Sequence, residues 1–256
     1  MTFAVTVLGS GTVAPSAGRV APAHWVEAGA LRVLLDCGAG ALHRAAGLAV
    51  PWQTVTHVAI THFHPDHWGE LPHLLLALRW GIEPGRQDPL VLLGPSGLEE
   101  RLAHLSGAFG AGVLDPGYPL EVVELAAEGS RPLDESAVLE WTRTPHTDES
   151  LALAVRFAGR RLVYTGDTGP SAELARWASG CDLLLAECSL PDDRAVAIHL
   201  TPAQAGALAR DAAAKSLVLT HFYPPVEAAQ PARQAALAYA GPVAAARDGD
   251  RFVIEA

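Results

Sequence analysis

The chain has 256 residues, half of them apolar, and a formal net charge of -10. This length is sufficient for a substantial buried core, whereas the longest apolar runs, such as 74–78 and 183–186, are far shorter than the about 20 residues of a membrane span. The negative charge repels polyanions at long range, although bound cations would reverse it locally. We therefore expect no membrane partner and no stable nucleic-acid binding.

The amino terminus and the cysteines bear on the cellular compartment. Residues 1–8 lack a basic segment and lead directly into strand-like sequence, so no secretory signal is predicted. Cys37, Cys181 and Cys188 are odd in number and lack CxxC spacing, which indicates neither a disulfide framework nor a zinc ribbon. They are expected to be small core residues, with Cys188 left open because of its neighbours. A cytoplasmic protein is the expectation.

Strand-like runs alternate with helical patterns along the chain. The predicted strands are 3–8, 25–28, 31–35, 54–60, 90–93, 138–143, 151–157, 161–164, 183–186 and 217–220. The predicted helices are 41–49, 71–80, 98–105, 172–177, 202–214 and 231–239. No linker or repeat interrupts the pattern, so we predict a single α/β domain over 1–256, with pseudo-halves of about 1–119 and 120–256 and helices outside two sheets.

Four metal-ligating side chains, His62, His64, Asp66 and His67, fall within six consecutive residues. They follow an apolar run that reads as a buried strand and precede a helical segment, so they lie on a strand-to-helix loop. A solvated His-rich loop or a single structural metal clip is the alternative. A cluster of imidazoles and a carboxylate with no cysteine nearby is more typical of an open catalytic metal site.

Three further residues stand directly after apolar runs: His146, Asp167 and His221. Taken singly, each is explained as well by a hydrogen-bonded histidine or a Gly-Asp turn. Together with the first cluster they make five His and two Asp, a set that suits two cations sharing an Asp and activating a water between them.

On these residues the sequence resembles the metallo-β-lactamase-fold hydrolase superfamily, and within it the ribonuclease Z-like phosphodiesterase branch. The matching motifs are His62-Phe-His-Pro-Asp-His67, His146, Tyr164-Thr-Gly-Asp-Thr168 and Leu219-Thr-His-Phe222. The resemblance implies an αββα sandwich of two mixed sheets flanked by helices. It places His62, His64 and His146 on one metal ion. It places Asp66, His67 and His221 on the other, with Asp167 bridging the two.

Two shorter matches concern catalysis. Ala186-Glu-Cys-Ser-Leu190 and His199-Leu-Thr201 resemble ribonuclease Z segments, which implies that His199 stabilises or protonates a phosphoryl oxygen while Glu187 orients it. Asp66 is a candidate proton acceptor. The alternative is that His199 caps a helix beside Thr201 and that Glu187 is a strand-end charge.

The remaining histidines and one early carboxylate have structural explanations. Asp36 matches a family motif and is expected to support the ligand loop through hydrogen bonds. The histidines that match no family ligand position, and are expected to be packing or surface residues, are His24, His43, His57, His73 and His104.

The sequence also departs from the family. Ribonuclease Z proteins carry a basic, Gly/Pro-rich arm that grips tRNA, and they usually place it between the positions of His146 and Asp167. Here that interval holds only twenty residues, which read as two strands. The family's N-terminal loop, with Lys and Asn around an Arg, stands here as residues 15–20 and keeps only Arg19. The tRNA-binding equipment is therefore predicted to be absent.

We predict a binuclear metal-dependent hydrolase, a phosphodiesterase in which hydroxide formed at the metals attacks a small or single-stranded phosphodiester. The alternatives are a tRNA 3′ endonuclease, a lactone or thioester hydrolase, and a catalytically silent metal-binding carrier protein. Two divalent ions are implied, with zinc favoured by the His-rich set and manganese or iron also accepted by Asp ligands. A homodimer is left open.

Overall fold

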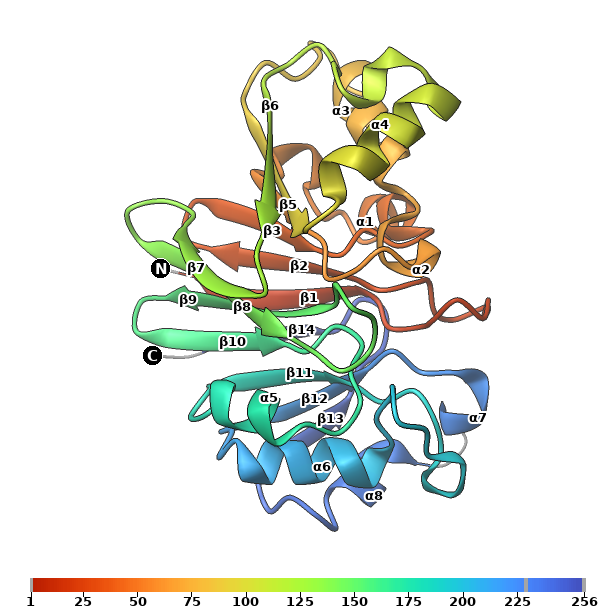
Figure 1. Cartoon of the computed structure of the whole chain (residues 1–256), viewed down its shortest axis with the longest axis vertical. Helices are drawn as coiled ribbons and strands as arrows, with labels where there is room; N and C mark the ends of the chain where they lie inside the picture. Colours follow the sequence, from red (N-terminus) through yellow and green to blue (C-terminus); the bar gives the residue numbers. More distant parts are fainter. Residues whose placement is uncertain (1, 228–229, 255–256) are drawn as a thin grey trace.

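Two seven-stranded β-sheets face each other, and helices cover their outer sides (Figure 1). The computed structural model describes residues 2–227 and 230–254. The predicted α/β class and αββα layering are confirmed.

The first sheet has the strand order β14-β1-β2-β3-β4-β5-β6. Its strands are β14 (Arg251–Val253), β1 (Phe3–Gly9), β2 (Ala23–Ala28), β3 (Leu31–Leu35), β4 (His57–Ala59), β5 (Leu90–Pro95) and β6 (Leu120–Leu125). The helices packed on or beside its outer face are α1 (Ala41–Gly47), α2 (Pro65–Trp68), α3 (Leu71–Trp80) and α4 (Leu98–Phe109). In α3, Leu71, Leu74, Leu75 and Leu78 recur at helical spacing and are buried against this face.

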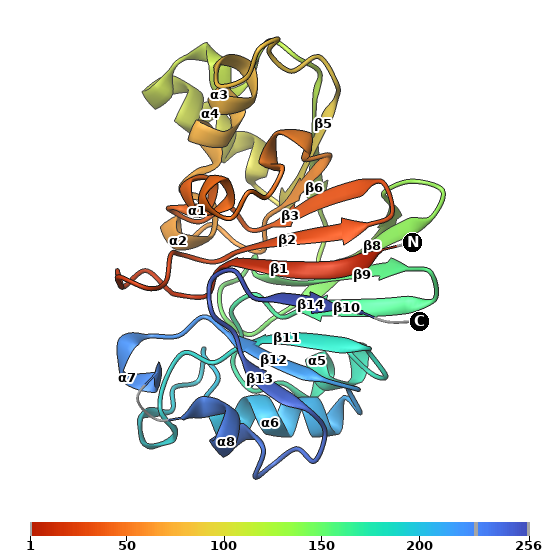
Figure 2. The ribbon, with the colours of Figure 1, turned by 180° about the vertical axis from the view of Figure 1, so that it is seen from behind.

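The second sheet has the order β13-β12-β11-β10-β9-β8-β7. Its strands are β7 (Glu128–Pro132), β8 (Ala137–Arg143), β9 (Leu151–Phe157), β10 (Arg160–Tyr164), β11 (Leu183–Glu187), β12 (Leu217–Thr220) and β13 (Val243–Ala245). Its helices are α5 (Ala172–Trp177), α6 (Pro202–Asp211), the short α7 (Pro224–Glu227) and α8 (Pro231–Ala235). Figure 2 shows α6 and α8 beneath β12 and β13.

Strand alternation explains how the sheets pack. In β9, Leu151, Leu153 and Val155 enter the core between the two sheets, whereas Ala152 and Ala154 face the helices on the other side. Successive strand residues point to opposite faces, so an unbroken apolar run is expected where both faces are covered. The inter-sheet core is thus continuous across both halves of the chain.

Several element boundaries differ from the prediction. The expected strand 54–60 is shorter, because Trp52–Thr54 forms a 3-10 turn and only β4 (His57–Ala59) pairs. Four strands were not predicted: β6, β7, β13 and β14. β6, β7 and β14 expose charged side chains and β13 has only three residues, so their apolar signal is weak.

The division into halves follows the sheets only in part. The chain leaves the first sheet after β6, and β14 returns to it from the C-terminal end. The single domain over 1–256 stays a prediction. Within residues 2–227 and 230–254, the structure contains no helix long and apolar enough to cross a membrane.

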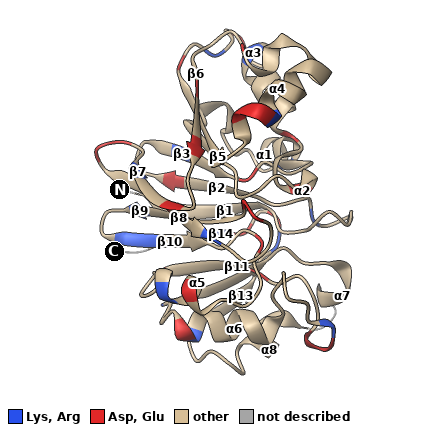
Figure 3. Cartoon of the chain, viewed as in Figure 1, with Lys and Arg blue, Asp and Glu red and all other residues tan. Residues whose placement is uncertain are grey.

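The chain direction of the central strands positions the site. β10, β11 and β12 are parallel neighbours, as are β3, β4 and β5, so their carboxyl ends lie at one edge of each sheet. Loops that follow these ends are therefore brought together. The basic residues Arg160 and Arg161 lie at the start of β10, at the opposite edge (Figure 3).

Candidate metal centre

All seven predicted ligands converge at these strand ends. His62, His64 and the α2 residues Asp66 and His67 follow β4, whereas His146 lies on the β8–β9 connection. Asp167 follows β10 and His221 follows β12. Side chains up to 159 positions apart, His62 and His221, therefore lie close together. Within each group of possible metal ligands, the ligand atoms lie within 4.8 Å of one another.

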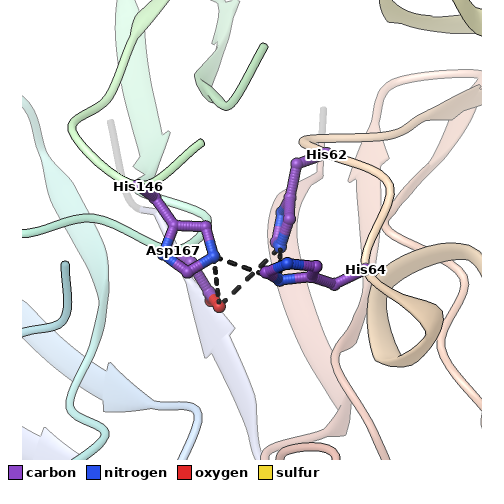
Figure 4. A group of neighbouring side chains, drawn as sticks. All are labelled: His62, His64, His146 and Asp167. Atoms are coloured by element: carbon purple, nitrogen blue, oxygen red, sulfur yellow. Dashed lines mark hydrogen bonds and ion pairs between the residues drawn. The ribbon is translucent and has the colours of Figure 1, made fainter. Parts of the chain in front are cut away.

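The first group contains His62, His64, His146 and Asp167 (Figure 4). His64 Nδ1 lies 3.0 Å from His62 Nε2 and 3.1 Å from His146 Nε2. Asp167 Oδ2 lies 3.8 Å from His62 Nε2 and 3.6 Å from His146 Nε2. Three ring nitrogens and one carboxylate oxygen thus face a common point.

The second group contains Asp66, His67 and His221. His67 Nε2 and His221 Nε2 are 3.3 Å apart, and Asp66 Oδ2 is 3.5 Å from His221 Nε2. Asp167 Oδ1 lies 3.3 Å from both of these nitrogens. Asp167 therefore directs one oxygen to each group, as a bridging carboxylate would.

In four histidines, the contacts of the ring nitrogen that faces away from the cluster determine the tautomer. His67 Nδ1 lies 2.7 Å from Asp36 Oδ2, and His146 Nδ1 lies 3.0 Å from the Ile198 carbonyl. Carboxylate and carbonyl oxygens only accept hydrogen bonds, so both Nδ1 atoms carry the proton. His62 Nδ1 and His221 Nδ1 likewise face hydroxyls that donate elsewhere, those of Thr61 and Ser189. Each Nε2 is left with a bare lone pair in the cluster.

This donor set fits a pair of cations. Lone pairs of neutral imidazoles repel one another at these distances unless positive charge lies between them. Asp167 Oδ1 is buried and has no hydrogen-bond partner among the described residues, which is costly for a carboxylate unless an ion neutralises it. Burial alone lowers the pKa of His67, but the charges of Asp167 and Asp36 outweigh it and raise that pKa. The cluster therefore attracts positive charge.

Asp36 holds the ligand loop, as the sequence predicted. This fully buried carboxylate accepts hydrogen bonds from Thr61 N at 2.8 Å, from His67 Nδ1 and from the Tyr164 hydroxyl at 2.8 Å. Its backbone has φ 58°, and His221 has φ 60°. Such left-handed conformations are uncommon outside glycine, although Asp and His adopt them more readily than most residues, and they often occur at functional sites.

The Glu187 carboxylate is buried and accepts several hydrogen bonds, so it is not a solvated charge at the end of a strand. Its carboxylate accepts from Thr168 N at 2.7 Å, Leu200 N at 3.1 Å, Ser189 Oγ at 2.6 Å and His199 Nδ1 at 2.9 Å. Four donors satisfy an ion that would otherwise be costly to bury. The connection that carries His199 is thereby fixed to the ends of β10 and β11.

His199 lies beside both ligand groups. Its ring centroid is 4.8 Å from that of His146 and 5.9 Å from that of His221. Burial disfavours its charged form, but the hydrogen bond and charge of Glu187 and the charge of Asp167 raise its pKa. The cap of α6 is Thr201, in a capping box with Gln204, so helix capping by His199 is wrong.

Sequence reasoning missed two residues that support the site. Tyr164 is predicted only as a strand residue and as the start of the motif 164–168, and Ser189 only as part of the motif 186–190. A hydroxyl directly after a strand that ends in Glu was the available signal for Ser189. The three cysteines are buried, and Cys188 packs in the core between the second sheet and its helices.

The other histidines do not join the groups. His43, His73 and His104 lie at the surface or are partly exposed, whereas His57 is buried on β4. His24 is completely buried, and its ring nitrogens have no hydrogen-bond partner within the part of the chain that the structure describes. Burial lowers its pKa to about 3. It packs edge-on to Tyr164 with ring centroids 4.6 Å apart.

Replacing Ser189 by Ala is expected to weaken metal binding. The change removes the acceptor for His221 Nδ1 and one donor to Glu187, and loss of such a supporting hydrogen bond typically lowers metal affinity about 10- to 100-fold. Titration of the loaded protein with a competing chelator measures the affinity. Ser189→Thr keeps the hydroxyl and should stay near wild type. Unchanged affinity in Ser189→Ala would show that His221 needs no such support.

The fold and the donor set together define a metal-dependent hydrolase with the metallo-β-lactamase architecture. The model of the β-lactamase superfamily domain matches residues 31–222. The ribonuclease Z of Mycobacterium bovis is 31% identical, with 91% of each chain covered. That of Mycobacterium avium is 31% identical, with 98% of each chain covered. The chain belongs to this superfamily, in its ribonuclease Z-like branch, as predicted.

Solved structures agree with this placement. The short form of human tRNase Z superposes with a TM-score of 0.82 and 25% identity, covering 99% of this chain and 100% of that chain. The metallo-β-lactamase-fold protein YhfI of Bacillus subtilis gives a TM-score of 0.85 with 22% identity, covering 99% and 100%. The second likeness concerns the fold alone.

Proposed function

We propose that this protein is a binuclear phosphodiesterase acting on a small or single-stranded phosphodiester. The observation that carries this proposal is Asp167, whose two oxygens face separate His-rich groups beside His199. A shared carboxylate between two cations is the arrangement used for in-line displacement at phosphorus. His62, His64 and His146 would hold one ion, and Asp66, His67 and His221 the other.

Two divalent cations bound there would polarise the phosphate and activate a water for attack on phosphorus. Asp66 would accept a proton at its carboxylate. His199 holds a proton on Nδ1 against Glu187, and with its raised pKa it can carry a second on Nε2 for the leaving oxygen. Glu187 keeps the ring in place as charge develops. Zinc is proposed because imidazole dominates the donor set, with manganese or iron as alternatives.

The curated relatives favour the tRNA 3′ endonuclease as the second candidate, since they are named ribonuclease Z. Three observations favour a smaller substrate. β9 and β10 fill the interval between His146 and Asp167. The segment 107–118 folds onto α3 through Val113 and Tyr118. The alignment with the Mycobacterium avium protein runs over 282 positions, more than the 256 residues here, so that relative carries insertions that this chain lacks.

Metal-loaded protein is expected to hydrolyse bis(4-nitrophenyl) phosphate and to bind precursor tRNA weakly, without single-site cleavage at its 3′ boundary. Tight tRNA binding requires many phosphate contacts and falls steeply with salt, whereas this chain has a net charge of -10. Release of 4-nitrophenol and a gel assay with precursor tRNA test the two substrates. Efficient single-site cleavage at nanomolar enzyme would establish the endonuclease instead. Turnover of lactones or thioesters only would exclude both. No turnover of any of these substrates would favour the silent metal-binding carrier.

The homodimer, the cytoplasmic location and the absence of stable nucleic-acid binding stay predictions.

A further inference from the structure

An open recess lies beside the second ligand group. Its walls are the β1–β2 connection between Thr12 and Ala21, together with Ala39, Pro65 and Asp66, and its volume is about 310 Å³. Asp66 also faces His221 in the cluster. A substrate whose phosphoryl group lies at the cluster therefore has this recess next to the reacting phosphorus.

The walls are mainly apolar. Val13, Pro15, Val20 and Pro65 are among the apolar residues of the lining, and Val13 is 58% exposed. Arg19 is the one cation among the lining residues, and its guanidinium is engaged: Nη1 donates to Ser10 Oγ and to the Ala246 carbonyl, and the group stacks over Phe222 at 4.7 Å. The recess therefore suits an uncharged group better than a second phosphate.

The shape of the recess is fixed by contacts with the C-terminal segment. Asp248 accepts hydrogen bonds from Ser10 N at 3.0 Å, Ser10 Oγ at 2.6 Å and Val20 N at 2.8 Å. Its Oδ2 also pairs with Arg44 at 3.3 Å, and the Asp248 side chain is 1% exposed. The buried Asp248 carboxylate is hydrogen-bonded near both ends of the β1–β2 connection. It therefore keeps the recess open before substrate binds, which lowers the free-energy cost of ordering this connection on binding.

We propose that this recess binds one ester substituent of the phosphodiester, a compact and uncharged aromatic or apolar group. This inference rests on the function proposed above and narrows its substrate class. Small-molecule pockets span about 300–1,000 Å³, so the volume here accommodates a single ring system and not a polymer. Specificity then comes from the fit of one group beside the metals.

A pair of phosphonates tests this without turnover. Phenylphosphonate and methylphosphonate present the same anion to the metals and differ only in the group offered to the recess. Calorimetry with metal-loaded protein should show phenylphosphonate binding about tenfold more tightly, since burial of the ring removes apolar surface from water. In Ala39→Phe, where Ala39 is exposed and lines the recess, the added ring occupies the space and the advantage should disappear.

The controls separate this inference from the proposed function. Ala103→Phe makes the same change at an exposed position of α4 and should keep the tenfold preference. Val13→Asp provides a second variant, in which a carboxylate in the recess should weaken phenylphosphonate more than methylphosphonate. If wild type hydrolyses bis(4-nitrophenyl) phosphate but the preference is absent, or survives both recess variants, the recess assignment is wrong and the phosphodiesterase stands. If phenylphosphonate is preferred as expected but the wild-type protein hydrolyses no diester, the proposed function is wrong and the recess assignment is not.

Discussion

Metal-saturated protein is expected to hold two divalent ions per chain, and Asp167→Ala no more than one. Asp167 supplies an oxygen to each histidine group, so its loss removes a ligand from both sites at once. Turnover should fall at least about 100-fold, because loss of a residue that only supports a ligand already lowers activity by up to about 100-fold. Elemental analysis of dialysed protein and the rate of diester hydrolysis measure the two effects.

Asp148→Ala is the matched control, because Asp148 is an exposed carboxylate two residues after His146. It should keep both ions and wild-type turnover. A saturated value of one ion in wild type, unchanged in Asp167→Ala, would contradict the binuclear assignment. Two ions retained in Asp167→Ala would show that Asp167 lies near the metals without binding them.

His199→Ala is expected to keep its metals and to lower kcat by about 10²- to 10⁴-fold, the range for a general acid or base. His199 bonds through Nδ1 to Glu187 and Ser189 and is not one of the seven predicted ligands, so the predicted ligand set stays complete when the ring is removed. Measuring kcat and metal content in parallel distinguishes loss of a general acid from loss of the metal site. His64→Ala should lose both metal and turnover.

Two variants sharpen this test. His104→Ala removes an exposed imidazole from α4 and should change neither quantity. Glu187→Gln keeps an acceptor for His199 but loses the charge that raises its pKa, so kcat should fall while metal content is retained. Wild-type kcat on several diesters in His199→Ala would rule out its part in the reaction.

The architecture was largely predictable, because its long buried strands carry local signals. Residues 151–155 and 183–186 are apolar and covered on both faces, and the leucines of α3 recur at helical spacing. The strands β7 and β14 gave no such signal. They are held by pairing with neighbours, and backbone pairing to a distant strand leaves no pattern in the strand's own sequence.

The candidate ligand set was also predicted from the sequence, because metal chemistry restricts residue types and the motifs place these residues directly after strands. What the sequence left open was how these residues share protons and charge. Helix capping was the weaker of two interpretations of His199, and the structure excludes it because Thr201 caps α6 and the buried Glu187 carboxylate lies against the ring. Ser189 and Tyr164 acquired their roles only through hydrogen bonds to residues 32 and 128 positions away.

Sequence alone therefore determined the layers of this protein and the chemistry of its donors, since periodicity and residue type are local properties. The tertiary structure decided the direction of each Asp167 oxygen, the tautomers of four histidines and the hydrogen bonds of Arg19 to Ser10 and Ala246. These depend on atoms from distant strands meeting at one sheet edge. A hydrogen bond of about 3 Å depends on which atoms the fold brings together at that edge, and spacing along the chain does not determine it.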